Sequence, residues 1–125
     1  MAVTRADSSD FDAKMAGADL RTSLMYAAKI DTDGRLVLAT SGDLVHGIIT
    51  ETGNTNEPVT VQTQGLTKAV AQAGITAGAR VMAHSNGKII TATGAGKNVL
   101  GVARNTVANA DEIVEIQIAR GQVPA

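Results

Sequence analysis

From residue 24 onward, short segments of alternating apolar and polar residues follow one another along the chain. Thr, Val and Ile dominate these segments, and glycine recurs between them at short intervals. This pattern predicts short β-strands joined by tight turns. Two segments alternate most strongly, VTVQT at 59–63 and IVEIQI at 113–118. Each is expected to bury one face of a strand and to expose the other.

The order of these segments occurs twice. The same order of residues is found at 28–40 (AKIDTDGRLVLAT) and at 81–93 (VMAHSNGKIITAT). In each segment a polar turn ends in glycine and is followed by a basic residue, aliphatic residues and Ala-Thr. The turns contain Asp-Gly and Asn-Gly, which are hairpin signals because a type I′ turn needs positive φ at both central residues. The sequence therefore predicts the same hairpin in both copies.

Each copy continues with an aliphatic strand that contains a glycine, LVHGII at 44–49 and VLGVA at 99–103. The glycines are Gly47 and Gly101, and glycine inside a strand suggests a bulge or the close approach of another backbone. A loop rich in Thr, Asn and Ala follows, and the strongly alternating segment closes the unit.

We therefore predict an all-β fold, a small barrel or sandwich, made of two tandem β units over about 24–66 and 75–121 within a β domain spanning 24–125. One such unit alone buries too little surface to be stable, whereas two packed together make a core. For the linking stretch at 66–80, alanine content allows a short helix at 66–73. The repeat instead favours an extended conformation for residues 66–71, followed by turns at Gly74 and Gly78, and we prefer this interpretation.

Residues 1–23 differ from the rest and are predicted to form a flexible, extended N-terminal arm. Charged residues are mixed there with Ala and Ser, and Phe11, Met15 and Leu20 are the large apolar residues after Val3. Phe11 and Met15 are four apart, which also fits a short amphipathic helix. Two interpretations stay open, a frayed terminus and an arm that becomes ordered on a partner with Phe11 as anchor.

Composition excludes several function classes. The chain has 125 residues, a net charge of −1 and 2% aromatic residues, so it offers neither a strong field nor a stacking platform for nucleic acid. It has no cysteine, which removes disulfides and thiolate metal sites. No apolar run is long enough for a membrane span and no signal peptide is recognised. We expect a soluble domain that is made inside the cell.

Candidate chemical motifs are incomplete. Residues 94–101 (GAGKNVLG) lack the Ser or Thr after Lys that a phosphate loop needs. Residues 31–34 (DTDG) lack the closing ligands of a calcium loop. His46 and His84 lie in non-equivalent parts of the two units and do not make a zinc site without further ligands. The serines carry no nucleophile signature. We therefore expect no catalytic residues, no cofactor and no metal.

One combination of segments resembles a known family. ITAGARV at 75–81, a polar turn with Asn-Gly, IITAT at 89–93, VLGVA at 99–103 and EIVEIQIARG at 112–121 are similar to the capsid decoration (cement) proteins of tailed bacteriophages. The first copy fits the same order, so the resemblance covers about residues 24–121.

The resemblance implies a structural protein that binds the outer surface of the mature phage head. Its partners would be the major capsid protein and other copies of itself, as a homotrimer at three-fold positions, with no nucleic acid or membrane. It would be made in the host cytoplasm, become part of the virion, and stabilise the head against DNA pressure. Phe11, Met15 and Leu20 are the expected capsid-binding residues of the arm, because burying a large apolar side chain contributes about 1.5–3 kcal/mol.

Three alternatives remain at this stage. The chain fits another β module of a virion, such as a fibre base or a tail accessory. It also fits a small β-barrel that binds a ligand, although small core residues favour a filled interior. An enzyme is disfavoured, since no nucleophile and base are recognised together.

Overall fold

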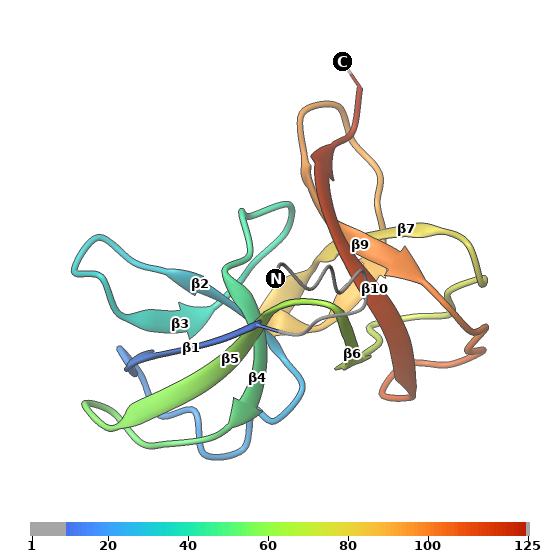
Figure 1. Ribbon diagram of the computed structural model, residues 1–125. Coiled ribbons are helices and arrows are strands. Elements are labelled where there is room, and N and C mark those ends of the chain that lie inside the picture. The colour runs from blue at the N-terminus through green and yellow to red at the C-terminus, as the bar shows by residue number, and fades with distance from the viewer. Residues whose placement is uncertain (1–9, 125) are drawn as a thin grey trace, which may run out of the picture.

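Two antiparallel sheets of five strands make up the described part of the protein (Figure 1). The computed structural model describes residues 10–124. The first sheet has the order β1-β5-β4-β2-β3. Its strands are β1 (Asp10–Met15), β2 (Ala27–Ile30), β3 (Leu36–Leu38), β4 (Gly47–Glu51) and β5 (Pro58–Gln64). The second sheet has the order β6-β10-β9-β7-β8. Its strands are β6 (Leu66–Val70), β7 (Arg80–Ala83), β8 (Ile89–Thr91), β9 (Asn98–Ala103) and β10 (Ile113–Gln122).

The two sheets repeat one topology, because the orders become identical when five is subtracted from each strand number in the second. We call residues 10–64 the first unit and residues 66–122 the second unit, with Gly65 between them. The all-β prediction of two tandem units is confirmed, and the sheets are sandwich-like rather than closed into a barrel. One 3₁₀ turn, η1 (Ser85–Gly87), lies between β7 and β8.

Each unit begins with a strand that the predicted boundaries at 24 and 75 left out. β1 pairs with β5 as β6 pairs with β10. Residues 10–23 are therefore part of the first unit in this structure, which corrects the expectation of a flexible arm for that stretch. The remainder of the predicted arm, residues 1–9, lies outside the described residues. In the second unit, the preferred extended interpretation of 66–71 is confirmed by β6.

The two predicted hairpin turns differ in their backbone. Asn86 and Gly87 have φ of 57° and 77°, as a type I′ turn requires. In the first unit Gly34 has a φ of 77° but Asp33 is not in the positive region. There the Asp31 carboxylate accepts the backbone N–H groups of Asp33 and Arg35, both at 2.9 Å. This side-chain hydrogen bonding selects another turn.

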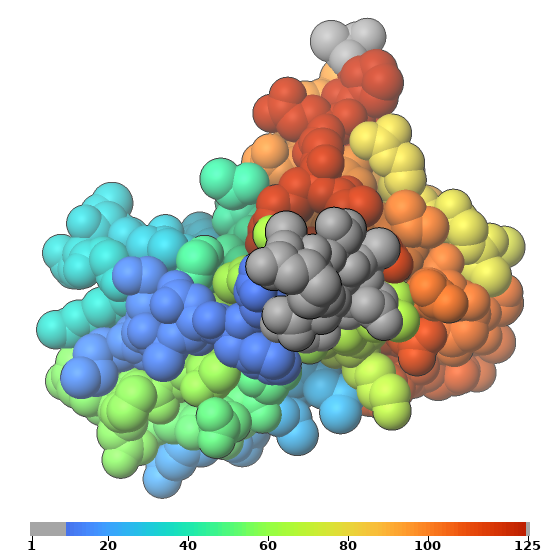
Figure 2. Space-filling view, viewed as in Figure 1, coloured from blue at the N-terminus to red at the C-terminus, as the bar shows by residue number. Residues whose placement is uncertain are grey.

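The main core is shared between the units, which fixes how they sit together. Ala27, Val45 and Ile48 of the first unit belong to one buried cluster with Leu100 and Ile116 of the second. A second cluster lies within the first unit alone. In Figure 2 the two units form adjoining lobes, and the end of β10 projects from the second lobe.

Candidate functional site

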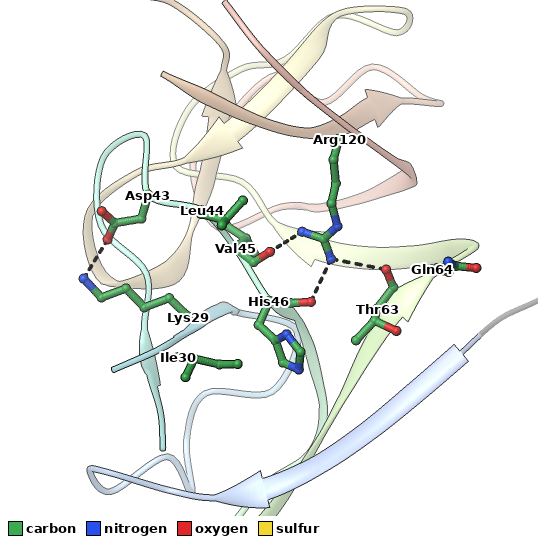
Figure 3. A pocket seen from close by; sticks show the side chains of 9 residues that line it. All are labelled: Lys29, Ile30, Asp43, Leu44, Val45, His46, Thr63, Gln64 and Arg120. Carbon is green, nitrogen blue, oxygen red and sulfur yellow. Dashed lines mark hydrogen bonds and ion pairs between the residues drawn. The ribbon is translucent and has the colours of Figure 1, made fainter. Parts of the chain in front are cut away.

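A cavity of about 620 Å³ forms an open groove where β10 of the second unit meets the first unit (Figure 3). Side chains reach it from the end of β2, the loop before β4, the end of β5 and the last third of β10. The lining residues are Lys29, Ile30, Asp43, Leu44, Val45, His46, Thr63, Gln64 and Arg120. The groove thus combines residues that lie far apart in the sequence.

Arg120 crosses the groove and holds the two units together. Its guanidinium donates hydrogen bonds to the backbone carbonyls of Val45, His46 at 2.7 Å and Thr63 at 3.2 Å. Burial lowers the pKa of Arg120 below its ordinary value, but an arginine stays charged at any physiological pH. Its donors are directed at carbonyls of the first unit, so Arg120 acts as an anchor between the units.

The other titratable side chains at the groove each have a side-chain partner. Lys29 Nζ lies 2.9 Å from Asp43 Oδ2. Burial acts to raise the pKa of Asp43, but hydrogen bonds from Thr40 and Lys29 outweigh it, and the net pKa is lowered. His46 Nε2 lies 2.7 Å from Asp12 Oδ2 on β1. That hydrogen bond is the main reason that the pKa of Asp12 lies below its usual value.

This arrangement is suited to holding a partner segment, because apolar side chains alternate with fixed polar groups around an open groove. Leu44 stands at its rim and is 66% exposed, more than any other large apolar side chain of the described residues. Between residues 10 and 124 no three His, Cys, Asp or Glu side chains are grouped to hold a metal ion. No helix in this part of the chain is long and apolar enough to cross a membrane.

The two histidines considered from the sequence lie apart. His46 pairs with Asp12, whereas His84 Nδ1 contacts the hydroxyl of the adjacent Ser85 at 3.0 Å. A serine nucleophile needs a histidine that a third group orients. In the described part of the chain no carboxylate is hydrogen-bonded to His84.

The three predicted binding residues separate into two environments. Phe11 and Met15 lie on the same face of β1 and are 58% and 52% exposed. Leu20 is 1% exposed and belongs to the core of the first unit, and its N–H donates to the Gly53 carbonyl at 2.9 Å. Leu20 is therefore corrected from a surface contact to a core residue. What Phe11 and Met15 contact stays a prediction.

Sequence reasoning did not single out Leu44 or Arg120. Arg120 lies in the last third of β10, two residues after the alternating segment IVEIQI, and an arginine just beyond that segment was the available signal. Its partners are main-chain carbonyls more than 50 residues away, and no residue type in the sequence marks such acceptors.

Comparison with known proteins gives two findings. Residues 17–118 match a family model described as phage cement protein. Among solved structures, the crystal structure of the head fiber gp8.5 N base in bacteriophage phi29 is similar, with a TM-score of 0.69. That match has 12% sequence identity and covers 94% of this chain and 100% of the other, so it shows a shared fold. No curated protein matches the sequence.

Proposed function

The chain belongs to the phage cement protein family, and from that premise we propose that it binds the outside of the mature head and ties neighbouring capsid subunits together. The match over residues 17–118 is the observation that carries the proposal. A role in decorating the phage capsid places the protein in the virion. It is a structural role that needs no reacting groups, and the paired charges of the groove are in keeping with it.

Several properties of the molecule support a role in resisting mechanical force. The two units share one core and are linked by Arg120 and by a single residue, Gly65. The net charge of −1 means that copies packed closely on a shell repel one another weakly. We propose that trimers form at three-fold positions, because three linked copies bind with far higher avidity than one. Resistance to the pressure of packaged DNA follows from bridging adjacent subunits.

The groove beside Leu44 is the surface that we assign to the capsid. Its apolar residues offer burial to a capsid segment, and Lys29, Asp43 and Arg120 supply fixed polar groups around it. Leu44 is already exposed, so binding requires no rearrangement of the core. The contact of Phe11 and Met15 with the capsid, expected from the sequence, is a separate prediction that a Met15→Glu protein in the same binding assay would examine.

The test is co-sedimentation of the purified protein with heads that lack it, both expanded heads and unexpanded precursors. We expect binding to expanded heads that saturates at a fixed copy number per capsid subunit. Leu44→Glu should reduce the bound fraction at least tenfold, whereas Ile113→Glu, an exposed apolar position on the second unit, should not. Binding to neither kind of head would contradict the proposal.

A second candidate is the base of a head fibre, which the fold similarity to the phi29 structure favours. Both candidates place the protein on the head, but a fibre base must carry a projecting structure. Electron microscopy of labelled particles distinguishes them. A smooth shell of labelled protein supports the cement role, and label confined to the bases of fibres supports the alternative.

A further inference from the structure

The duplication allows the residues of the two units to be matched one by one. Phe11 lies opposite Gln62 on β5, and Leu66 lies opposite Gln117 on β10. Both pairs occupy the same place in their sheets, so Phe11 corresponds to Leu66 and Gln62 to Gln117. By the same pairing Met15 corresponds to Val70.

In the second unit this edge is covered by the first unit. The carbonyl of Leu66 accepts a hydrogen bond from Gln62 Nε2 at 2.7 Å, and the N–H of Val70 donates to the Met25 carbonyl at 3.2 Å. Val70 is only 9% exposed. The turn residue Gly87 is also packed, since a Cβ there would lie 2.7 Å from the Ala27 carbonyl.

In the part of the chain that the structure describes, nothing covers the corresponding face of the first unit. Phe11 and Met15 are 58% and 52% exposed, whereas Leu66 and Val70 at the corresponding positions are 36% and 9% exposed. Gly34 corresponds to Gly87, and no described atom lies within 4 Å of the place where its Cβ would be. The first unit therefore carries an uncovered copy of the face by which the second unit docks.

The second unit in turn carries an uncovered copy of the surface that receives this face. Gly78 matches Met25, because both have positive φ, 88° and 67°. Their N–H groups also donate to equivalent strands at 2.8 Å, Met25 to the Ile49 carbonyl on β4 and Gly78 to the Ala103 carbonyl on β9. Gln117 holds on β10 the place that Gln62 holds on β5. Gly78 is exposed and Gln117 is partly exposed, so a carbonyl and an amide are present where the internal junction uses them.

The sizes of the apolar residues differ between the internal junction and the two free surfaces. In the internal junction Leu66 and Val70 face the larger pair Leu24 and Met25, and Leu24, Met25 and Leu66 line one cavity. On the free surfaces the larger side chains are Phe11 and Met15, and the positions of Leu24 and Met25 are taken by Ala77 and Gly78. The free surfaces therefore place larger side chains on the β1 face against smaller ones on the receiving surface, with less total side-chain volume than in the internal junction.

The charges are complementary as well. Asp33 corresponds to Asn86, next to Gly87, and Arg80 corresponds to Ala27, against which Gly87 packs. Where the internal junction has two neutral residues, the free surfaces therefore carry opposite charges. Within residues 10–124 neither Asp33 nor Arg80 has an ion-pair partner.

We propose that a second copy of this chain docks head to tail on the β1 face, placing its Gly78 and Gln117 surface over Phe11 and Met15 and repeating the junction between the units. Such a contact joins unlike surfaces, and it closes into a ring when the rotation per copy allows. The inference rests on the duplicated fold and holds whether or not the protein binds a capsid. A capsid segment is the alternative occupant of this face.

The test uses the absence of cysteine from the sequence. Asp33→Cys and Arg80→Cys proteins, one of them isotope-labelled, are mixed under oxidising conditions and analysed by mass spectrometry. We expect disulfide-linked pairs that contain one chain of each kind, and few pairs from either protein alone. Met15→Glu in the Asp33→Cys chain should remove most of the product, whereas Ile113→Glu in the same chain should leave it unchanged.

The experiment is repeated on decorated heads, so that a contact formed only there is also detected. A mixture of Asp33→Cys with Ile113→Cys gives the background level of mixed pairs. If Asp33→Cys and Arg80→Cys give no more mixed pairs than this background, both in solution and on heads, the proposal is overturned. The β1 face would then be assigned to the capsid. Linkage of Asp33→Cys to itself would also overturn it, because that requires a two-fold contact. Loss of capsid binding with the linkage intact would refute only the proposed function.

A charge exchange gives an independent test. Asp33→Arg and Arg80→Asp should each lower the average mass of the protein in sedimentation, because like charges then face each other across the junction. The chain with both changes should recover the mass of the unaltered protein. Failure of the double change to recover self-association, with each single protein folded, would contradict the head-to-tail arrangement.

Discussion

Two glycines in equivalent strands let neighbouring backbones approach more closely than any side chain permits. A Cβ at Gly47 would lie 2.5 Å from the Gln62 carbonyl oxygen, and one at Gly101 would lie 2.1 Å from that of Gln117. Both obstacles are main-chain atoms in the middle of a sheet, which cannot turn aside as a flexible side chain would. The requirement for glycine thus comes from space rather than from backbone angle.

Gly101→Ala is expected to lower the free energy of unfolding by about 3 kcal/mol, since β9 and β10 must separate to admit one methyl group. The measurement is the urea midpoint followed by circular dichroism. Gly121→Ala on β10 is the control. A Cβ there meets the Arg80 side chain at an ordinary 3.6 Å, so a change under about 0.5 kcal/mol is expected. Equal effects of the two changes would contradict this account.

The Asp12–His46 pair makes the free energy of unfolding depend on pH in the acidic range. Its hydrogen bond lowers the pKa of Asp12 from the ordinary 3.8, so the folded state binds this proton less readily than the unfolded chain. The contribution is therefore complete above about pH 4 and is lost as pH falls through the lowered pKa.

Asp12→Asn should flatten the decline of the urea midpoint in that acidic range and lower the midpoint slightly at neutral pH. Asp10→Asn on the same strand removes a charge without removing an ion pair of the described residues, and serves as control. An unchanged acid profile in Asp12→Asn would show that the pair does not contribute.

At the scale of elements, the sequence predicted the strands whose buried side chains are aliphatic. Val59 and Val61 are buried as the alternation at 59–63 indicated, and Val114 and Ile116 are buried on the opposite face from Ile113. Gly47 and Gly101 were correctly connected with a close backbone approach. These features are local, so a pattern of period two and a turn signal are enough to predict them.

β1 was missed for a physical reason. Its residues alternate, but the apolar members Phe11 and Met15 face outward while Asp12 and Lys14 are the partly buried ones. An inverted pattern without β-branched residues resembles an arm. The strand exists because its backbone pairs with β5. The groove could not be predicted from the sequence either, because Lys29 and Arg120 come together only through the packing of the two sheets.

Truncation tests the role of this first strand. Deleting residues 1–20 removes β1 and Leu20 from the first unit, so we expect its core to lose cooperative unfolding. Deleting residues 1–9 leaves every described strand in place and should preserve the thermal transition. Differential scanning calorimetry compares the two. A fully folded protein without residues 1–20 would restore the sequence-based expectation of a separate arm.

At the scale of the whole molecule, Arg120 couples the units through three carbonyls of the first one. Arg120→Lys should lower the free energy of unfolding by about 2 kcal/mol, because one ammonium cannot replace the planar fork and half-buried carbonyls lose their donors. Amide exchange should rise at residues 45–48 and 63–66. Arg104→Lys, an exposed arginine paired with Glu115, is the control and should change little. Unaltered exchange in Arg120→Lys would show that the shared core alone holds the units.

The passage from β5 to β6 through one residue has a mechanical consequence. A force that pulls the two lobes apart cannot first extend a flexible linker, because Gly65 is the single residue between β5 and β6. The bonds on either side, Ile118 N–H to the Gly65 carbonyl at 3.0 Å and Gln62 to the Leu66 carbonyl, take the strain at once. The molecule should therefore be mechanically stiff under tension, with little extension before the two lobes separate abruptly.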